Sequence, residues 1–102
     1  MKRIYISGPM TGLPGQNMAA FDAEALRLRG LGFEAENPAE INAWAEDGWH
    51  ACMRRDLAAL LTCDTLALLE GWQRSAGAHL EMHIAHRVGI EIVLVGEIGP
   101  CQ

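Results

Sequence analysis

Short strand-like runs alternate with stretches of helical periodicity along the whole chain. The helical patterns cover residues 18–29, 39–44, 49–61 and 75–88, and the strand-like runs cover residues 3–7, 33–36, 65–69 and 90–95. This alternation is typical of a parallel sheet, because each parallel neighbour is reached through a crossover helix. Right-handed crossovers then place helices on both faces of the sheet. The sequence therefore predicts an α/β fold with a three-layer parallel sheet and the element order βαβααβαβ.

Length and composition favour one domain with a buried core. A chain of 102 residues, half of them apolar, has room for one core and not for two, so we predict a single domain over residues 1–102. The longest apolar runs have only a few residues, whereas roughly 20 are needed to cross a bilayer. No apolar segment of a secretory signal follows the first residues. We therefore expect a cytoplasmic protein without a membrane partner.

The charge balance and the cysteines exclude further classes of protein. Eight Lys and Arg stand against thirteen Asp and Glu, and a net charge of -5 has the wrong sign for a protein that follows a phosphate backbone. We therefore expect no nucleic acid polymer as a partner. The three cysteines, Cys52, Cys63 and Cys101, have no C-x-x-C spacing, which argues against a disulfide framework and against a zinc ribbon.

The carboxyl ends of the predicted strands are the place to search for a ligand site, because ligands of parallel sheets bind there. The segments concerned are residues 7–16, the stretch from residue 37 onward, and residues 70–77. The glycines of the first segment match neither G-x-G-x-x-G nor a Walker loop: Gly8, Gly12 and Gly15. We therefore expect no dinucleotide, triphosphate or other cofactor, and a glycine-rich loop that contacts a small ligand remains.

Glu81, in the middle of the last helical pattern, is the most informative residue. Its helical neighbours are small or apolar, which predicts a stripe that faces the sheet: Gly77, Ala78, Ala85 and Val88. Burying a carboxylate is costly unless the group is paired or used in chemistry. Two interpretations stay open at this point. Glu81 is either an acid paired with a nearby arginine or a catalytic carboxylate.

The opposite side of the same helix carries His79, His83 and His86 at a spacing that can bind a metal. The zincin motif requires H-E-x-x-H, whereas Glu81 lies two residues after His79, on another side of the helix. The pattern therefore favours a solvated or subunit-facing histidine stripe, and we predict no metal site.

Several other polar and aromatic residues have structural explanations. Asn17 can cap the helix over residues 18–29, and Asp56, which follows two arginines, is most simply a salt-bridged helix residue. Ser75 is either a helix cap or, with the free N–H groups of the helix start, part of an anion site. The three tryptophans favour core or rim packing over base stacking: Trp44, Trp49 and Trp72.

Taken together, short motifs in a fixed order carry a family resemblance: Tyr5-Ile6-Ser7-Gly8-Pro9, Asp56, Asp64, and Gly77 four residues before Glu81. The chain resembles the nucleoside 2-deoxyribosyltransferase-like superfamily, especially its short phage-type and bacterial branch (DUF4406-like). In that family a strand ends in Tyr-x-x-Gly-Pro, and an aspartate on a helix precedes a second aspartate by eight residues. A glycine then lies four residues ahead of the nucleophilic glutamate. The resemblance covers nearly the whole chain and implies a flavodoxin-like α/β fold.

The resemblance implies a glycosyl-transferring site. Cleavage of an N-glycosidic bond passes through an oxocarbenium-like state, which a carboxylate can trap as a covalent glycosyl ester. Glu81 is then the nucleophile, Tyr5 donates a hydrogen bond to it, and Asp56 protonates the leaving base. Gly8 and Gly77 let the backbone approach the sugar closely.

The position six residues before the nucleophile bears on the substrate. Transferases of the family carry an aspartate there, whereas this chain has Ser75, which resembles the 5'-monophosphate N-glycosidases. Those hydrolases also carry an arginine in the first loop, where this chain has Met10 and resembles the transferases; Arg74 is a candidate substitute. The residues expected to bind substrate are Ser7, Gly8, Pro9, Met10, Ser75, Ala76 and Gly77.

The first hypothesis is cleavage of the N-glycosidic bond of a nucleoside or a nucleoside 5'-monophosphate, by hydrolysis or by transfer. The alternative is a non-catalytic sensor of nucleotide derivatives on the same fold. A phosphoribohydrolase with G-G-x-G-T-x-x-E is less favoured, because residues 77–81 lack the threonine and the glycine pair before it. In the resembled family a neighbouring subunit closes the site, so we expect a homodimer or a larger even homo-oligomer.

Overall fold

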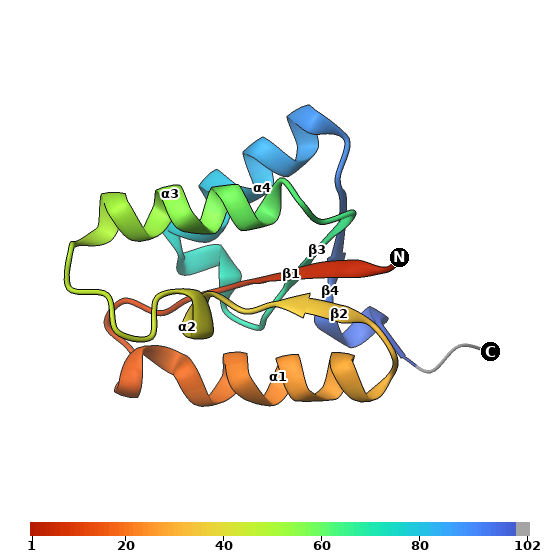
Figure 1. The fold of residues 1–102 in the computed structure, drawn as a ribbon, viewed down its shortest axis with the longest axis horizontal. Coiled ribbons are helices and arrows are strands. Elements are labelled where there is room, and N and C mark those ends of the chain that lie inside the picture. Colours follow the sequence, from red (N-terminus) through yellow and green to blue (C-terminus); the bar gives the residue numbers. More distant parts are fainter. Residues whose placement is uncertain (100–102) are drawn as a thin grey trace.

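Four parallel strands form one sheet in the computed structural model, which describes residues 1–99 (Figure 1). The strands are β1 (Arg3–Ser7), β2 (Glu34–Glu36), β3 (Thr65–Leu68) and β4 (Glu91–Leu94), and their order across the sheet is β2-β1-β3-β4. The helices are α1 (Met18–Gly30), α2 (Pro38–Ile41), α3 (Trp49–Leu60) and α4 (Ala76–Val88). Residues 1–99 also contain three short 3-10 turns, η1 (Pro14–Asn17), η2 (Trp72–Arg74) and η3 (Val95–Glu97). The predicted three-layer α/β fold and element order are confirmed.

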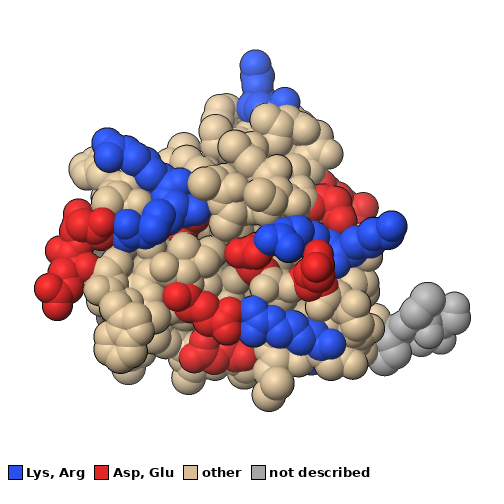
Figure 2. Space-filling view, viewed as in Figure 1, with Lys and Arg blue, Asp and Glu red and all other residues tan. Residues whose placement is uncertain are grey.

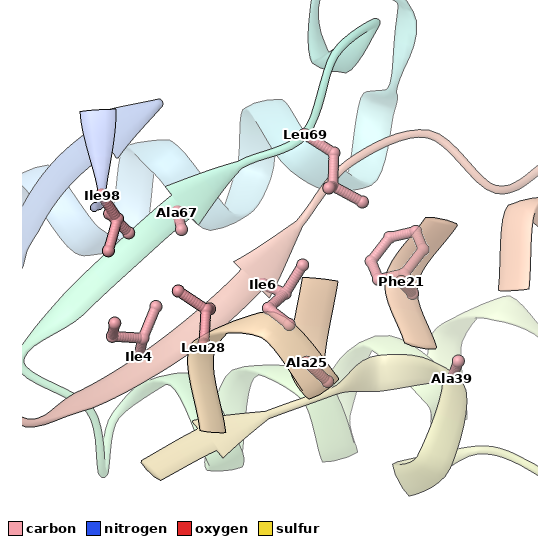
Figure 3. Packing of buried hydrophobic residues seen from close by; sticks show 9 residues of the cluster. All are labelled: Ile4, Ile6, Phe21, Ala25, Leu28, Ala39, Ala67, Leu69 and Ile98. Carbon is pink, nitrogen blue, oxygen red and sulfur yellow. The ribbon is translucent and has the colours of Figure 1, made fainter. Parts of the chain in front are cut away.

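The two faces of the sheet are covered by different helices, because successive side chains of a strand point to opposite sides. Ile4 and Ile6 of β1 belong to the cluster beneath α1, whose members Figure 3 shows: Ile4, Ile6, Phe21, Ala25, Leu28, Ala39, Ala67, Leu69 and Ile98. Tyr5 belongs to the cluster on the other face, with Leu60 of α3 and Ala85 of α4. The polar residues of β1 therefore face α3 and α4.

Several predicted boundaries differ from the structure. The predicted helix over residues 39–44 is the shorter α2, which begins at Pro38 and ends at Ile41. It begins early because the Asn37 side chain accepts a hydrogen bond from the N–H of Ala39 and so acts as the cap. β2 begins at Glu34 instead of residue 33, and β4 is shorter than residues 90–95.

Asn17 does not cap α1 with its side chain. Its backbone is left-handed, with φ 60°, and its side-chain N–H donates to the carbonyl of Pro9 at 2.9 Å. The asparagine therefore ties the loop after β1 to the start of α1. Within residues 1–99, none of the helices is of the length and hydrophobicity that a bilayer crossing requires.

Candidate active site

A cavity of about 770 Å³ opens at the carboxyl ends of β1 and β3. Its walls come from the loop after β1, the segment before α3, and the facing parts of α3 and α4. Nine residues that the sequence predicted for the site line it: Ser7, Gly8, Pro9, Met10, Asp56, Ser75, Ala76, Gly77 and Glu81. Sequence reasoning missed Phe21, Trp49, Cys52 and Met53, which also line the cavity. Their apolar spacing looks the same as that of core residues, so no signal separates them.

Glu81 lies at the base of the cavity and is only 4% exposed. The hydroxyl of Tyr5 donates to Glu81 Oε2 at 2.5 Å, and the hydroxyl of Ser7 donates to Oε1 at 2.6 Å. The interpretation of Glu81 as an acid paired with an arginine is wrong, because both partners are neutral hydroxyls. Burial raises the pKa of Glu81 to about 7, against the opposing effect of these two hydrogen bonds.

Both hydroxyl donors come from β1. Tyr5 and Ser7 are two residues apart, so they lie on the same face of the strand, and both are fully buried. Burial, followed by the negative charge of Glu81, raises the pKa of Tyr5 well above its usual value, so the phenol keeps its proton. The donation of Ser7 to Glu81 was not predicted, although the period-two spacing from Tyr5 is a signal for it.

Asp56, on α3, is the second carboxyl group of the cavity and is 7% exposed. The prediction of a salt bridge for this residue is wrong, because the guanidinium of Arg55 instead holds Asp47 through two hydrogen bonds of 2.8 Å. Asp56 Oδ1 accepts a hydrogen bond from Asn42 Nδ2 at 2.7 Å. Burial raises the pKa of Asp56 to about 6, although the Asn42 bond and the charge of Arg55 lower it.

Ser75 is the cap of α4. Its Oγ accepts a hydrogen bond from the N–H of Ala78 at 3.0 Å, and its hydroxyl donates to the carbonyl of Gly8 at 3.4 Å. The cap interpretation of Ser75 is thus confirmed, while its part in an anion site stays a prediction.

Close packing explains the glycine at position 8, because a Cβ on Gly8 would lie 2.8 Å from the Cβ of Leu69.

Asp64 and the histidine stripe, which the sequence singled out, lie outside the cavity. Asp64 accepts hydrogen bonds from the backbone N–H groups of Lys2 and Arg3 at the amino end of the sheet. His83 and His86 are exposed on α4. Among residues 1–99, no group of three or more His, Cys, Asp or Glu side chains is arranged to hold a metal ion. Cys101 lies outside the described residues.

The tryptophans have three different environments. Trp72 packs against the cluster beneath α3 and α4, and Trp49 lines the mouth of the cavity with 48% of its surface exposed. These two fit the predicted core or rim positions. Trp44 does not, because it is 95% exposed.

Comparisons with known proteins agree with the fold. A solved 2-deoxyribosyltransferase from the psychrotolerant bacterium Bacillus psychrosaccharolyticus superimposes with a TM-score of 0.69 and 19% sequence identity, covering 95% of this chain and 76% of that chain. No curated protein is significantly similar in sequence. A family model, the domain of unknown function DUF4406, matches residues 2–94. This match spans most of the chain, and the chain therefore belongs to the DUF4406 family.

Proposed function

We propose that the protein cleaves the N-glycosidic bond of a nucleoside or of a nucleoside 5'-monophosphate, with Glu81 as the nucleophile. The observation that carries the proposal is the Glu81 carboxylate, buried at the base of a 770 Å³ cavity and held by two neutral donors. Buried carboxyl groups with a raised pKa are typical of catalytic sites. The structural neighbour, a 2-deoxyribosyltransferase, supports a nucleoside as the substrate.

In the first step, an oxygen of Glu81 attacks C1' of the sugar as the bond between C1' and the base nitrogen breaks. The electron pair of that bond stays on the base, which receives the proton of Asp56. In the second step, water or an acceptor base attacks C1', and the ester electrons return to Glu81. Asp56 takes up the proton that the attacking group loses. The choice of acceptor makes the protein a hydrolase or a transferase.

Tyr5 and Ser7 serve to orient the nucleophile. An arginine beside Glu81 would form an ion pair and withdraw charge from the attacking oxygen, whereas two hydroxyl groups fix the carboxylate without neutralising it. Tyr5 stays a donor over the working pH range because its pKa is raised. The two side chains are part of the buried sheet, so the carboxylate is held by a rigid element.

The first prediction concerns the pH dependence of kcat/KM, because the mechanism needs one proton shared by Asp56 and Glu81. Burial raises the pKa of Asp56 to about 6 and that of Glu81 to about 7. Below this range both groups are protonated and no carboxylate is free to attack; above it both are ionised and no acid is left. Between the two values the reacting form has its proton on Asp56 and its charge on Glu81, which is the minor singly protonated form because Glu81 has the higher pKa. We expect a bell-shaped profile with limbs near these two values, which belong to the pair rather than to one residue.

The measurement is the initial rate of base release between pH 4.5 and 9. Asp56→Asn removes the proton donor, so we expect a rate about 10²- to 10³-fold lower. The pH profile of the same variant should have a single limb, which is set by the ionisation of Glu81. A flat profile for the wild-type protein would contradict this assignment of acid and nucleophile.

The second prediction concerns a 5'-phosphate. Arg74 is the one cationic side chain among the described residues that line the cavity, and the N–H groups of Ala76 and Gly77 begin α4 beside it. A helix start concentrates donors and partial positive charge, which favours an anion. Ser75→Asp keeps a capping oxygen but adds a negative charge at this end of the cavity. We expect it to weaken binding of the monophosphate selectively.

The measurement compares kcat/KM for a nucleoside and for its 5'-monophosphate in the wild type and in Ser75→Asp. The ratio of the two values should fall about tenfold or more in the variant. Ser75→Thr, which keeps the hydroxyl and the cap, is the matched control and should preserve the ratio. Equal loss on both substrates would leave Ser75 with its capping role alone.

The proposed function itself is tested with a panel of nucleosides and 5'-monophosphates, with and without an added acceptor base. Chromatography then scores free base and exchanged nucleoside, which separates hydrolysis from transfer. If the panel yields no free base while one nucleotide binds tightly, the protein is a sensor and the proposed reaction is wrong.

A further inference from the structure

Asn42 connects the buried carboxyl group of Asp56 to a charged pair on the surface. Its Nδ2 donates to Asp56 Oδ1 at 2.7 Å, and its Oδ1 accepts from Arg55 Nε at 2.8 Å. Arg55 in turn donates from its two terminal guanidinium nitrogens, Nη1 and Nη2, to the carboxylate of Asp47. Figure 2 shows acidic and basic side chains in contact at the end of the molecule where α3 begins. The four residues therefore form one hydrogen-bonded chain from the surface to the cavity.

The orientation of the Asn42 amide is determined by this chain. A guanidinium has only donors, so the atom that faces Arg55 must be the amide oxygen. The NH2 group then points to Asp56. A flipped amide would place an oxygen against the Asp56 carboxyl group and a donor against Arg55, which loses both hydrogen bonds.

The hydrogen bond from Asn42 makes the two oxygens of the Asp56 carboxyl group chemically different. Oδ1 accepts the hydrogen bond of Asn42, whereas Oδ2 has no partner among the residues that the structure describes. Within residues 1–99, every side-chain oxygen that is sealed from solvent has a hydrogen-bond partner. Oδ2 has none among these residues, so it is accessible, and it opens into the cavity that Asp56 lines. A proton on Oδ1 would compete with the N–H of Asn42 for the same oxygen.

We infer that Asn42 is a positioning residue that places the proton of Asp56 on Oδ2, the oxygen that faces the cavity. The inference rests on the proposed function for the use of that proton, which passes from Oδ2 to the nitrogen of the leaving base as the O–H bond breaks and an N–H bond forms. Arg55 binds the amide oxygen of Asn42, and Asp47 binds Arg55, so these two residues fix the orientation of the Asn42 amide. The reaction needs the proton on this one oxygen, because the base binds in the cavity.

The charged and titratable groups around Asp56 are few. Arg55 lies next to it on α3, Glu81 approaches it from α4, and Tyr5 approaches it from β1. The Asp47 carboxylate beyond Arg55 has its pKa lowered to about 2 by the hydrogen bonds of that guanidinium, so it stays ionised between pH 4 and 8. A response of the Asn42 amide with a midpoint near 6 is therefore assigned to Asp56, whose carboxyl group it contacts at 2.7 Å.

The first experiment uses the unaltered protein. The side-chain amide protons of Asn42 are followed by ¹⁵N-resolved NMR between pH 4 and 8, together with the ¹³C resonance of the Asp56 carboxyl group. We expect the chemical shifts of the Asn42 amide protons to change with the same pH midpoint as the ¹³C shift of the Asp56 carboxyl group. The matched control is Asn37, whose Nδ2 donates to Asp22 at 2.9 Å and which should not follow that midpoint. An Asn42 amide that does not follow Asp56 would overturn the inference.

The second experiment removes the donor. A hydrogen bond to a carboxylate favours the ionised form, so Asn42→Ala should move the Asp56 midpoint about one pH unit higher. The control is Glu40→Gln, which weakens the exposed two-bond ion pair of α2 with Arg29 and leaves the Asn42 amide in place. This control should leave the Asp56 midpoint in place. An unchanged midpoint in Asn42→Ala would overturn the inference.

Neither experiment needs a substrate. If the titrations behave as expected and no nucleoside is cleaved, the proposed function fails while the assignment of Asn42 stands. If nucleosides are cleaved and Asn42 does not respond to Asp56, the assignment of Asn42 fails alone.

Discussion

Glu81→Ala is expected to lower turnover about 10⁴-fold or more, because removal of the proposed nucleophile closes the covalent route while binding is kept. The smaller side chain leaves the hydroxyls of Tyr5 and Ser7 beside a space that water can fill, so the variant should still fold. The measurement is base release under single-turnover conditions, with circular dichroism to confirm the fold. Glu91→Ala, at an exposed position on β4, is the control and should react as the wild type does.

A second readout strengthens this test. If the ester on Glu81 is an intermediate, wild-type protein quenched during turnover carries the added mass of the sugar, and the Glu81→Ala variant does not. Normal turnover by the variant would show that Glu81 is not the nucleophile. Loss of turnover without any trapped sugar in the wild type would favour direct displacement by water.

Glu81→Gln is expected to stabilise the protein above pH 7 while it abolishes the reaction. In the unfolded chain Glu81 ionises near its ordinary pKa of 4.5, whereas burial raises the folded-state pKa to about 7. Between these values unfolding releases a proton, so the wild type loses stability as pH rises through this window. Glutamine has no proton to lose. At pH 8 the variant should gain about 3 kcal/mol in the free energy of unfolding.

This stability prediction is checked by denaturant unfolding of both proteins at pH 5 and at pH 8. At pH 5 Glu81 is protonated in the folded state and only partly ionised beyond its pKa in the unfolded chain, so the wild type and Glu81→Gln should differ by less than about 1 kcal/mol from this cause. The gain should develop as pH rises and level off above 7. Glu40→Gln serves again as a control, because its partner Arg29 is on the surface and little change is expected. An equal effect of Glu81→Gln at both pH values would contradict the raised pKa.

The sequence was informative where a local pattern determines the result. The run of residues 3–7 is terminated by Gly8-Pro9 and its side chains alternate between the two faces, so both the strand and the orientation of Tyr5 toward Glu81 could be predicted. The stripe of small and apolar residues around Glu81 likewise predicted the burial of this face of α4, except at Val88, which is 55% exposed. Val88 is the last residue of α4, directly before the C-cap Gly89.

Features that depend on distant contacts could not be predicted. α2 ends early, and the Asn42 side chain beyond it reaches Asp56, 14 residues away. The partner of Arg55 is Asp47 rather than the adjacent Asp56 for the same kind of reason, since the loop before α3 brings Asp47 close. Periodicity carries no information on such pairs. The expected homo-oligomer and the identity of the substrate stay predictions.

On the proposed function, directed evolution toward a new base should find its useful substitutions at the open edge of the cavity and not at its buried end. Tyr5 and Ser7 are fully buried on the inner strand β1, so a change there costs stability before it can alter specificity. Thr11 and Trp49 line the cavity from exposed positions. Their replacement costs little folding free energy, so a library restricted to such positions keeps most of its members folded. The positions at the edge of the cavity that tolerate substitution are therefore distinct from the buried positions on which folding depends.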